Sequence, residues 1–265
     1  MLTYYKANLL KDMKLHSLYN GIFPKMKRNL FGKLFNFNKK HTTMNTILIY
    51  DGSFTGFLSA VYKVFDENLK EVSIVKPKHF VPDMFSESVK VASSEIYAKR
   101  VWNSLEIKTT KHGANELYKA FLSEIKGTED VLLRYIMYVY ASESYNYTDL
   151  SNVNALRVSQ VARMVTREMN HIQNYLSFKP SNNGMDLAVL NSNFNMLPLI
   201  GKYFKRKYPN KKWLIYDQRR NYGLYFNTKE IDRIHLSIDD QLKIYDKNNP
   251  IFYVNLENSQ AEVNC

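Results

Sequence analysis

Three short β-prone runs near the C-terminal end of the chain constrain the fold through the length of their connections. They cover residues 213–216, 222–226 and 231–236. Only a few residues separate each run from the next, which is enough for a hairpin, whereas a parallel crossover needs about a dozen residues or more. The sequence therefore predicts antiparallel pairing here and an α+β fold, with a doubly wound α/β sheet as the alternative.

The pattern that begins near residue 44 is that of a strand, a tight turn and a helix. An apolar run over residues 47–50 is followed by Asp51-Gly52-Ser53, and apolar residues then recur at helical spacing from Phe54 to Leu69. We expect a second strand over residues 72–75. The segment 78–88, which contains Pro82, is predicted to be a loop.

Helical patterns dominate the middle of the chain, and the clearest has apolar residues from Val158 to Leu176 on one side and polar residues on the other. A hairpin is expected next, with one strand ending at Phe178 and the other over residues 187–190. Asn195 is expected to cap a helix with Pro198 in its first turn. We predict one mixed, mainly antiparallel sheet, built from the N-terminal strand and the C-terminal hairpins and covered by the central helices. The other predicted helices cover residues 93–105, 115–125 and 128–141.

The net charge of +12 is distributed unevenly. Residues 1–43 hold nine Lys and Arg residues against one acid, Asp12, and show little apolar periodicity. We expect this extension to be a disordered leader or an over-extended start; a targeting presequence and a basic arm for nucleic acid or membrane are the alternatives. The sequence predicts a single domain over residues 44–236 and a tail over residues 237–265.

Several protein classes are disfavoured by what the sequence lacks. Cys265 is the only cysteine, so the chain has no intrachain disulfide and too few thiolates for an iron–sulfur cluster, which favours a reducing compartment, the cytoplasm. No apolar run reaches the roughly 18 residues of a membrane-spanning helix. Zinc-protease, zinc-deaminase and phosphate-loop motifs do not occur. We therefore expect a soluble protein without a cofactor or a metal site, and no membrane partner.

The densest basic segment of the body covers residues 202–220, where eight Lys and Arg residues stand against one acid and are interleaved with tyrosines. Cationic side chains contact phosphates and aromatic rings stack on unpaired bases, so this composition favours nucleic-acid binding. A solvated helix end, with lysines favoured by the helix dipole, is the alternative. The candidate contact residues, including two from the preceding helix, are Arg163, Arg167, Lys202, Lys205, Arg206, Arg219, Arg220 and Tyr222.

Three carboxylates are weak candidates for catalysis. Asp51 follows a strand and precedes a helix, where α/β proteins bind ligands, although Asp51 or Ser53 as a helix cap explains the same pattern. Asp51 and Asp217 would form an acid–base or metal-binding pair if they met in one cleft. Glu168 is expected to pair with a neighbouring arginine, with a general base as the alternative.

Three blocks in this order resemble a bacterial family of uncharacterised DNA-metabolism and DNA-repair proteins: Tyr50-Asp51-Gly52-Ser53-Phe54, the segment 194–199 (FNMLPL) and the segment 213–223 (WLIYDQRRNYG). The resemblance covers most of residues 44–236. Where the family is expected to carry Glu-x-His-Arg, this chain has Glu168-Met169-Asn170-His171.

The resemblance implies a role in DNA repair or modification, because members are encoded beside a radical SAM protein and a related domain is fused to uracil-DNA glycosylases. The leading hypothesis is a DNA-binding accessory protein that acts with a radical SAM partner. The alternatives are an enzyme of the glycosylase or nuclease type, with Asp51, Glu168 or Asp217 as the acid, and an adaptor that binds protein only.

Overall fold

The computed structural model describes residues 45–142, 145, 150–180, 185–236 and 260–261. The predictions for the extension 1–43 and for most of the tail 237–265 lie outside these residues. The chain forms two compact units. The single domain expected over residues 44–236 stays a prediction. Of the described residues, the N-terminal unit holds 45–121 and 125–160, and the C-terminal unit holds 122–124 and those from 161 onward.

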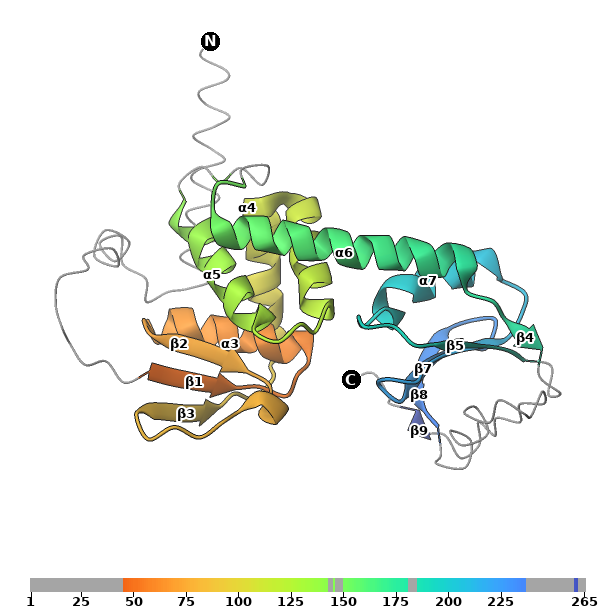
Figure 1. The fold of residues 1–265 in the computed structure, drawn as a ribbon, viewed down its shortest axis with the longest axis horizontal. Coiled ribbons are helices and arrows are strands. Elements are labelled where there is room, and N and C mark those ends of the chain that lie inside the picture. The colour runs from red at the N-terminus through yellow and green to blue at the C-terminus, as the bar shows by residue number, and fades with distance from the viewer. Residues whose placement is uncertain (1–44, 143–144, 146–149, 181–184, 237–259, 262–265) are drawn as a thin grey trace, which may run out of the picture. The chain divides into compact units, whose positions relative to one another are not determined.

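The N-terminal unit contains a parallel sheet in the order β2-β1-β3 (Figure 1). Leu48 and Ile74, at the centres of β1 and β2, are buried with the apolar residues of α3. This core explains why the sequence shows continuous apolar runs here, as is usual for parallel strands. The elements are β1 (Asn45–Ile49), α3 (Phe54–Asp66), β2 (Val72–Val75), the 3-10 turn η1 (Pro77–His79), β3 (Ser86–Lys90), α4 (Glu95–Leu122) and α5 (Thr128–Ala141).

The predicted loop over residues 78–88 is wrong in part, because it contains η1 and the start of β3. β3 lies at the edge of the sheet and most of its residues are exposed, so it lacks the apolar alternation that marks a strand. The predicted helices 93–105 and 115–125 correspond to α4, which is interrupted at Thr110, where φ is +68°.

The C-terminal unit contains a mixed sheet whose described strands follow the order β4-β5-β6-β7-β8-β9. β5 and β6 are parallel and connected through α7, whereas the other neighbours are antiparallel. The predicted antiparallel pairing of β6 with β7 and of β7 with β8 is therefore confirmed. The hairpin before them forms as well, but its first strand lies at residues 179–180, where the sequence predicted the turn, and does not end at Phe178. The elements are α6 (Val153–Tyr175), β4 (Lys179–Pro180), β5 (Asp186–Leu190), α7 (Leu197–Lys207), β6 (Trp213–Asp217), β7 (Tyr222–Phe226), β8 (Ile231–His235) and β9 (Gln260–Ala261).

The prediction of an α+β fold is confirmed, but the N-terminal strand does not join the C-terminal hairpins in one sheet. Strand patterns specify which face of a strand is buried and not which sheet it enters, so this detail lay beyond the sequence. No helix of the described residues is long and apolar enough to span a membrane.

One face of the C-terminal sheet is covered by α7 and by the second half of α6 (Figure 1). Val165 and Ile172 of α6 pack with Ile200 and Phe204 of α7 and with Trp213 of β6. Gly201 lets α7 approach the sheet closely, because a Cβ atom there would lie 2.9 Å from Leu224 Cδ1. The packed stripes of the two helices leave their opposite sides exposed.

Candidate functional site

The exposed side of α7 carries two of the predicted contact residues. Lys202 and Arg206 are exposed, and at 100° per residue they lie opposite the buried Ile200 and Phe204. Lys205 is half-buried: its ammonium group donates to the carbonyl oxygen of Lys229 at 2.6 Å. The acceptor in that hydrogen bond is a neutral carbonyl group and not a carboxylate, so the contact does not neutralise the positive charge of Lys205.

The exposed side of α6 carries two more. Arg163 and Arg167 are exposed, while Val165 and Ile172 face the core. Because α6 and α7 cover the same face of the sheet, their outer sides both point away from it. We call Arg163, Arg167, Lys202 and Arg206 the basic helix surface.

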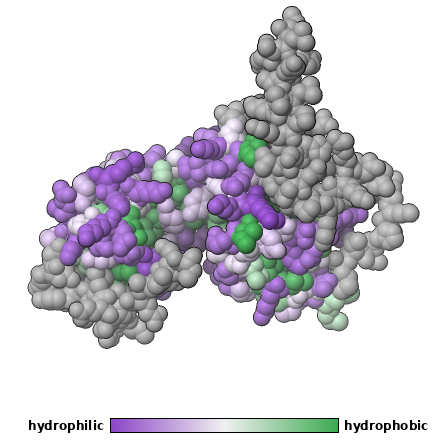
Figure 2. Space-filling view, turned by 180° about the vertical axis from the view of Figure 1, so that it is seen from behind, coloured by the Kyte–Doolittle hydropathy of each residue, from purple (hydrophilic) through white to green (hydrophobic). Residues whose placement is uncertain are grey.

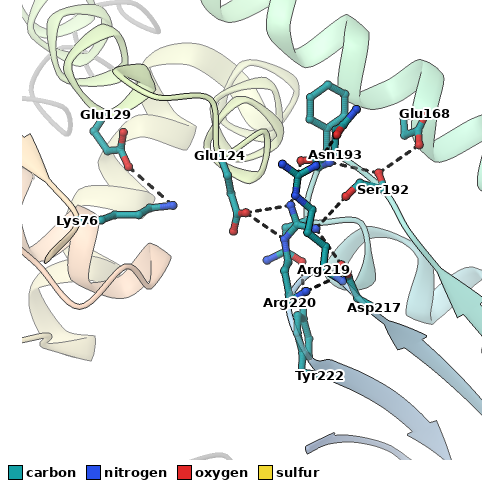
Figure 3. Close-up of polar contacts among 12 residues, drawn as sticks. Lys76, Glu124, Glu129, Glu168, Ser192, Asn193, Asp217, Arg219, Arg220 and Tyr222 are labelled. Atoms are coloured by element: carbon teal, nitrogen blue, oxygen red, sulfur yellow. Dashed lines mark hydrogen bonds and ion pairs between the residues drawn. The ribbon is translucent and has the colours of Figure 1, made fainter. Parts of the chain in front are cut away.

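Arg220, which the sequence placed among the contact residues, is half-buried. Its side chain is 10% exposed, and all three nitrogens of its guanidinium group contact oxygen atoms of the protein itself (Figure 3). They contact the Glu124 and Asp217 carboxylates at 2.9–3.0 Å and the carbonyl oxygens of Ser192 and Asn193 at 3.2 and 3.0 Å. These contacts commit the guanidinium to partners within the protein, so we leave Arg220 out of the basic helix surface.

The electrostatics of Arg220 follow from these contacts. Burial disfavours the charged guanidinium, but the hydrogen bond and the charge of Glu124, together with Asp217, outweigh it and raise the pKa of Arg220 above its ordinary value. Asp217 is fully buried, and one of its oxygens also accepts the backbone N–H groups of Arg219 and Arg220 at 3.0 and 3.2 Å. The pair therefore fixes the turn between β6 and β7.

Arg219 differs from its neighbour because its side chain is exposed. Its guanidinium donates to the side-chain oxygen of Asn193, which is a neutral group. The charge of Arg219 therefore stays at the surface, and this residue remains a candidate contact.

Tyr222, the predicted stacking residue, belongs to the core. Its side chain is only 5% exposed, and its hydroxyl donates to Asn195 Oδ1 at 2.6 Å. Burial raises the pKa of Tyr222 well above its ordinary value. The ring of Tyr222 therefore cannot offer its face to a base.

Asn195 is not the helix cap that the sequence suggested, because Met196 occupies the N-cap position of α7.

Two of the sequence blocks that carry the family resemblance meet in this network. Asn195 belongs to the FNMLPL block and Asp217, Arg220 and Tyr222 to the WLIYDQRRNYG block, and the contacts above join them. The backbone N–H of Asn195 also donates to the carbonyl oxygen of Leu122 at 2.9 Å. These motif residues therefore hold the C-terminal unit together.

Glu168 joins the same network from α6. The hydroxyl of Ser192 donates to its carboxylate at 3.1 Å, and the carbonyl oxygen of Ser192 accepts from Arg220 (Figure 3). The predicted partner was a neighbouring arginine, whereas this contact is with a serine hydroxyl. Glu168 and Asp217 thus lie in one network, and both carboxylates accept hydrogen bonds from the protein.

Asp51 lies in the N-terminal unit, at the carboxyl end of β1. Its two oxygens accept from the hydroxyls of Ser53 and Ser93, each at 2.7 Å, and from the backbone N–H of Ser53. Partial burial raises the pKa of Asp51, but these hydrogen bonds outweigh it and hold the pKa below its ordinary value. Ser53 caps α3, as the alternative interpretation expected, by accepting from the N–H of Gly56.

Two ion pairs of the structure have no local signal in the sequence. Glu124 lies 96 residues before Arg220, and nothing in its surroundings marks it as a partner. In the N-terminal unit, Lys76 and Glu129 form a buried ion pair at 3.8 Å (Figure 3). Glu129 also accepts a hydrogen bond from the hydroxyl of Tyr50 at 3.0 Å. The sequence marked Glu129 only as a favourable acid at the start of a helix.

The described residues contain no cluster of three or more His, Cys, Asp or Glu side chains that could hold a metal ion.

The comparisons with known proteins identify a family without assigning an activity. The chain matches no curated protein. A family model with the description "Domain of unknown function (DUF4130)" matches residues 126–262, which is more than half of the chain and includes both FNMLPL and WLIYDQRRNYG. The chain therefore belongs to the DUF4130 family.

Proposed function

We propose that this protein binds nucleic acid through the basic helix surface and serves as an accessory protein in DNA repair or DNA metabolism. The observation that carries the proposal is the charge of the C-terminal unit: its described residues include thirteen Lys and Arg against six Asp and Glu. In the N-terminal unit the corresponding numbers are thirteen and eleven. A local excess of exposed cations attracts a polyanion and releases its counterions.

Three of the six acids of the C-terminal unit pair with basic residues that lie outside the basic helix surface. Glu124 and Asp217 are taken by the single residue Arg220, and Asp186 lies 3.4 Å from the ammonium of Lys211. Hydrophilic side chains cover most of the visible surface of this unit, at the left of the space-filling view (Figure 2). Such a surface suits a phosphate backbone better than an apolar protein partner.

The partner in the reaction is proposed to be a radical SAM enzyme, which would bind the iron–sulfur cluster and perform the chemistry. This part of the proposal rests on the family resemblance of the sequence blocks. A chain with one cysteine cannot ligate such a cluster alone. The carboxylates of Asp51, Glu168 and Asp217 accept hydrogen bonds from the protein, as structural and catalytic carboxylates both do, so the DNA-acting enzyme stays the alternative prediction.

The test compares charge variants of the full chain, because the extension 1–43 is itself basic and adds its own attraction for a polyanion. Fluorescence anisotropy with labelled DNA would be measured at several salt concentrations. The slope of log K against log [salt] is negative for a protein that contacts phosphates. Replacing Lys202 and Arg206 by glutamine should make this slope on duplex DNA less steep by about 1.8, since each lost phosphate contact removes about 0.9.

The matched control replaces Lys99 and Arg100 by glutamine. These residues are adjacent and exposed on α4 of the N-terminal unit, so the change in net charge is the same. The control should keep the wild-type slope. Equal losses in the two variants would mean that net charge alone attracts DNA, and the proposed interface would be rejected.

A further inference from the structure

A row of exposed side chains runs along α6 within the C-terminal unit. Arg163, Arg167, His171 and Tyr175 follow one another at intervals of four residues, and all four are exposed. Side chains at this interval form a ridge inclined about 26° to the helix axis. The row therefore presents two guanidinium groups followed by two aromatic rings.

Tyr175, which ends this row, is more exposed to solvent than the tyrosines of the predicted basic segment. Tyr175 is 72% exposed, whereas Tyr216 and Tyr222 are buried and Tyr203 and Tyr208 are half-buried. Its ring contacts His171, with 4.8 Å between the ring centroids and a tilt of 41°. Most of the Tyr175 ring therefore remains accessible to a planar ligand.

Positive charge from a second helix reaches the same end of α6. The ammonium of Lys207, in the last turn of α7, donates to the carbonyl oxygen of Gln173 at 3.4 Å. Glu168 is the one acid of α6 beyond residue 160, and its carboxylate accepts from Ser192. The surroundings of the row are thus cationic next to an open ring, which suits an anionic ligand that carries a flat group.

We propose that this row binds single-stranded nucleic acid, with an unpaired base stacked on Tyr175 and the backbone phosphates at Arg167 and Lys207. The inference rests on the proposed function and deepens it by naming the form of nucleic acid. In a duplex the bases already stack on one another, so only an unpaired base can cover an exposed ring. Each stacked base strengthens binding about 5- to 150-fold.

The test measures binding of the full chain to three ligands: an oligothymidylate, an abasic strand of the same length, and a duplex. Tyr175→Ala should weaken binding of the oligothymidylate about 5- to 150-fold and leave the other two affinities unchanged. The salt dependence should not change, because the tyrosine carries no charge. Tyr175→Phe, which keeps a ring, should bind like the wild type.

The matched control is Phe85→Ala, since Phe85 is 79% exposed in the N-terminal unit and should not affect binding. Wild-type affinity of Tyr175→Ala for oligothymidylate would overturn the stacking inference and leave the proposed function standing. An equal loss on the abasic strand would also overturn the inference, because no base is present there. Vesicles of anionic phospholipid serve as a fourth ligand. If the wild type binds none of the three nucleic-acid ligands, whether or not it binds the vesicles, both proposals fall.

Discussion

Adjacent arginines in this chain have opposite roles, and only their surroundings distinguish them. Arg219 is exposed and contacts a neutral amide, whereas Arg220 is half-buried and balances two carboxylates. A buried carboxylate such as Asp217 is tolerated because a guanidinium compensates for its lost hydration. The density of basic residues in the sequence therefore overstates the charge that a ligand can reach.

Replacing Arg220 by methionine should destabilise the C-terminal unit. The change leaves the Asp217 carboxylate buried without its cation, and breaking a buried pair in this way costs about 3–5 kcal/mol. Arg219→Met is the matched control and should change the free energy of unfolding by less than about 0.5 kcal/mol. The difference is measured by urea unfolding of both variants, followed by tryptophan fluorescence. The chain has two tryptophans, Trp102 in α4 and Trp213 in β6, so a Trp102→Phe background leaves Trp213 as the reporter of the C-terminal unit. Equal stability of the two variants would refute the structural role of Arg220.

At the scale of elements, the sequence predicts most helices and hairpins but not their assembly. The helix α6 was predictable because apolar residues such as Val158 and Ile172 repeat at the helical period, and the pairing of β6 with β7 because the turn is short. β3 was not predictable, since an exposed edge strand lacks a buried face.

For the candidate site, the sequence predicts which residues are basic but not which of them are accessible. Lys202 and Arg206 are exposed as a surface role requires, whereas Tyr222 is buried by contacts with segments distant in the chain. The spacing of Tyr175 from Arg167, eight residues along the polar side of a predicted helix, is a signal that sequence reasoning could have used.

The start of α3 depends on the absence of a side chain at Gly56. A Cβ atom there would overlap a carboxylate oxygen of Asp51 and lie 2.7 Å from Ser93 Oγ. Alanine favours a helix over glycine by about 1 kcal/mol, yet forced overpacking costs about 1–3 kcal/mol.

We therefore expect Gly56→Ala to lower the free energy of unfolding of the N-terminal unit, as measured by urea unfolding followed by circular dichroism. Adding Asp51→Ala removes the overlapping atoms, so the double variant should lose less than the sum of the two single changes. A stabilised Gly56→Ala protein would show that helix propensity outweighs the close contact.

At the scale of the whole molecule, the two units differ in charge more than in composition. The described part of each contains thirteen Lys and Arg, but the N-terminal unit balances them with almost as many acids. Asn195, Asp217 and Arg220, which lie in two of the sequence blocks, contact one another's segments within the C-terminal unit, and the exposed cations of α6 and α7 lie outside that network. We therefore propose that the basic helix surface binds nucleic acid, whereas the residues of the FNMLPL and WLIYDQRRNYG blocks stabilise the C-terminal unit.

Photo-cross-linking of the full chain to a single-stranded oligonucleotide that contains 4-thiothymidine tests this assignment most directly. Mass spectrometry of the cross-linked peptides locates the contact along the chain. The account predicts cross-links within residues 161–176 and 197–208, with Tyr175 among the labelled positions. Cross-links confined to residues outside the C-terminal unit would contradict it.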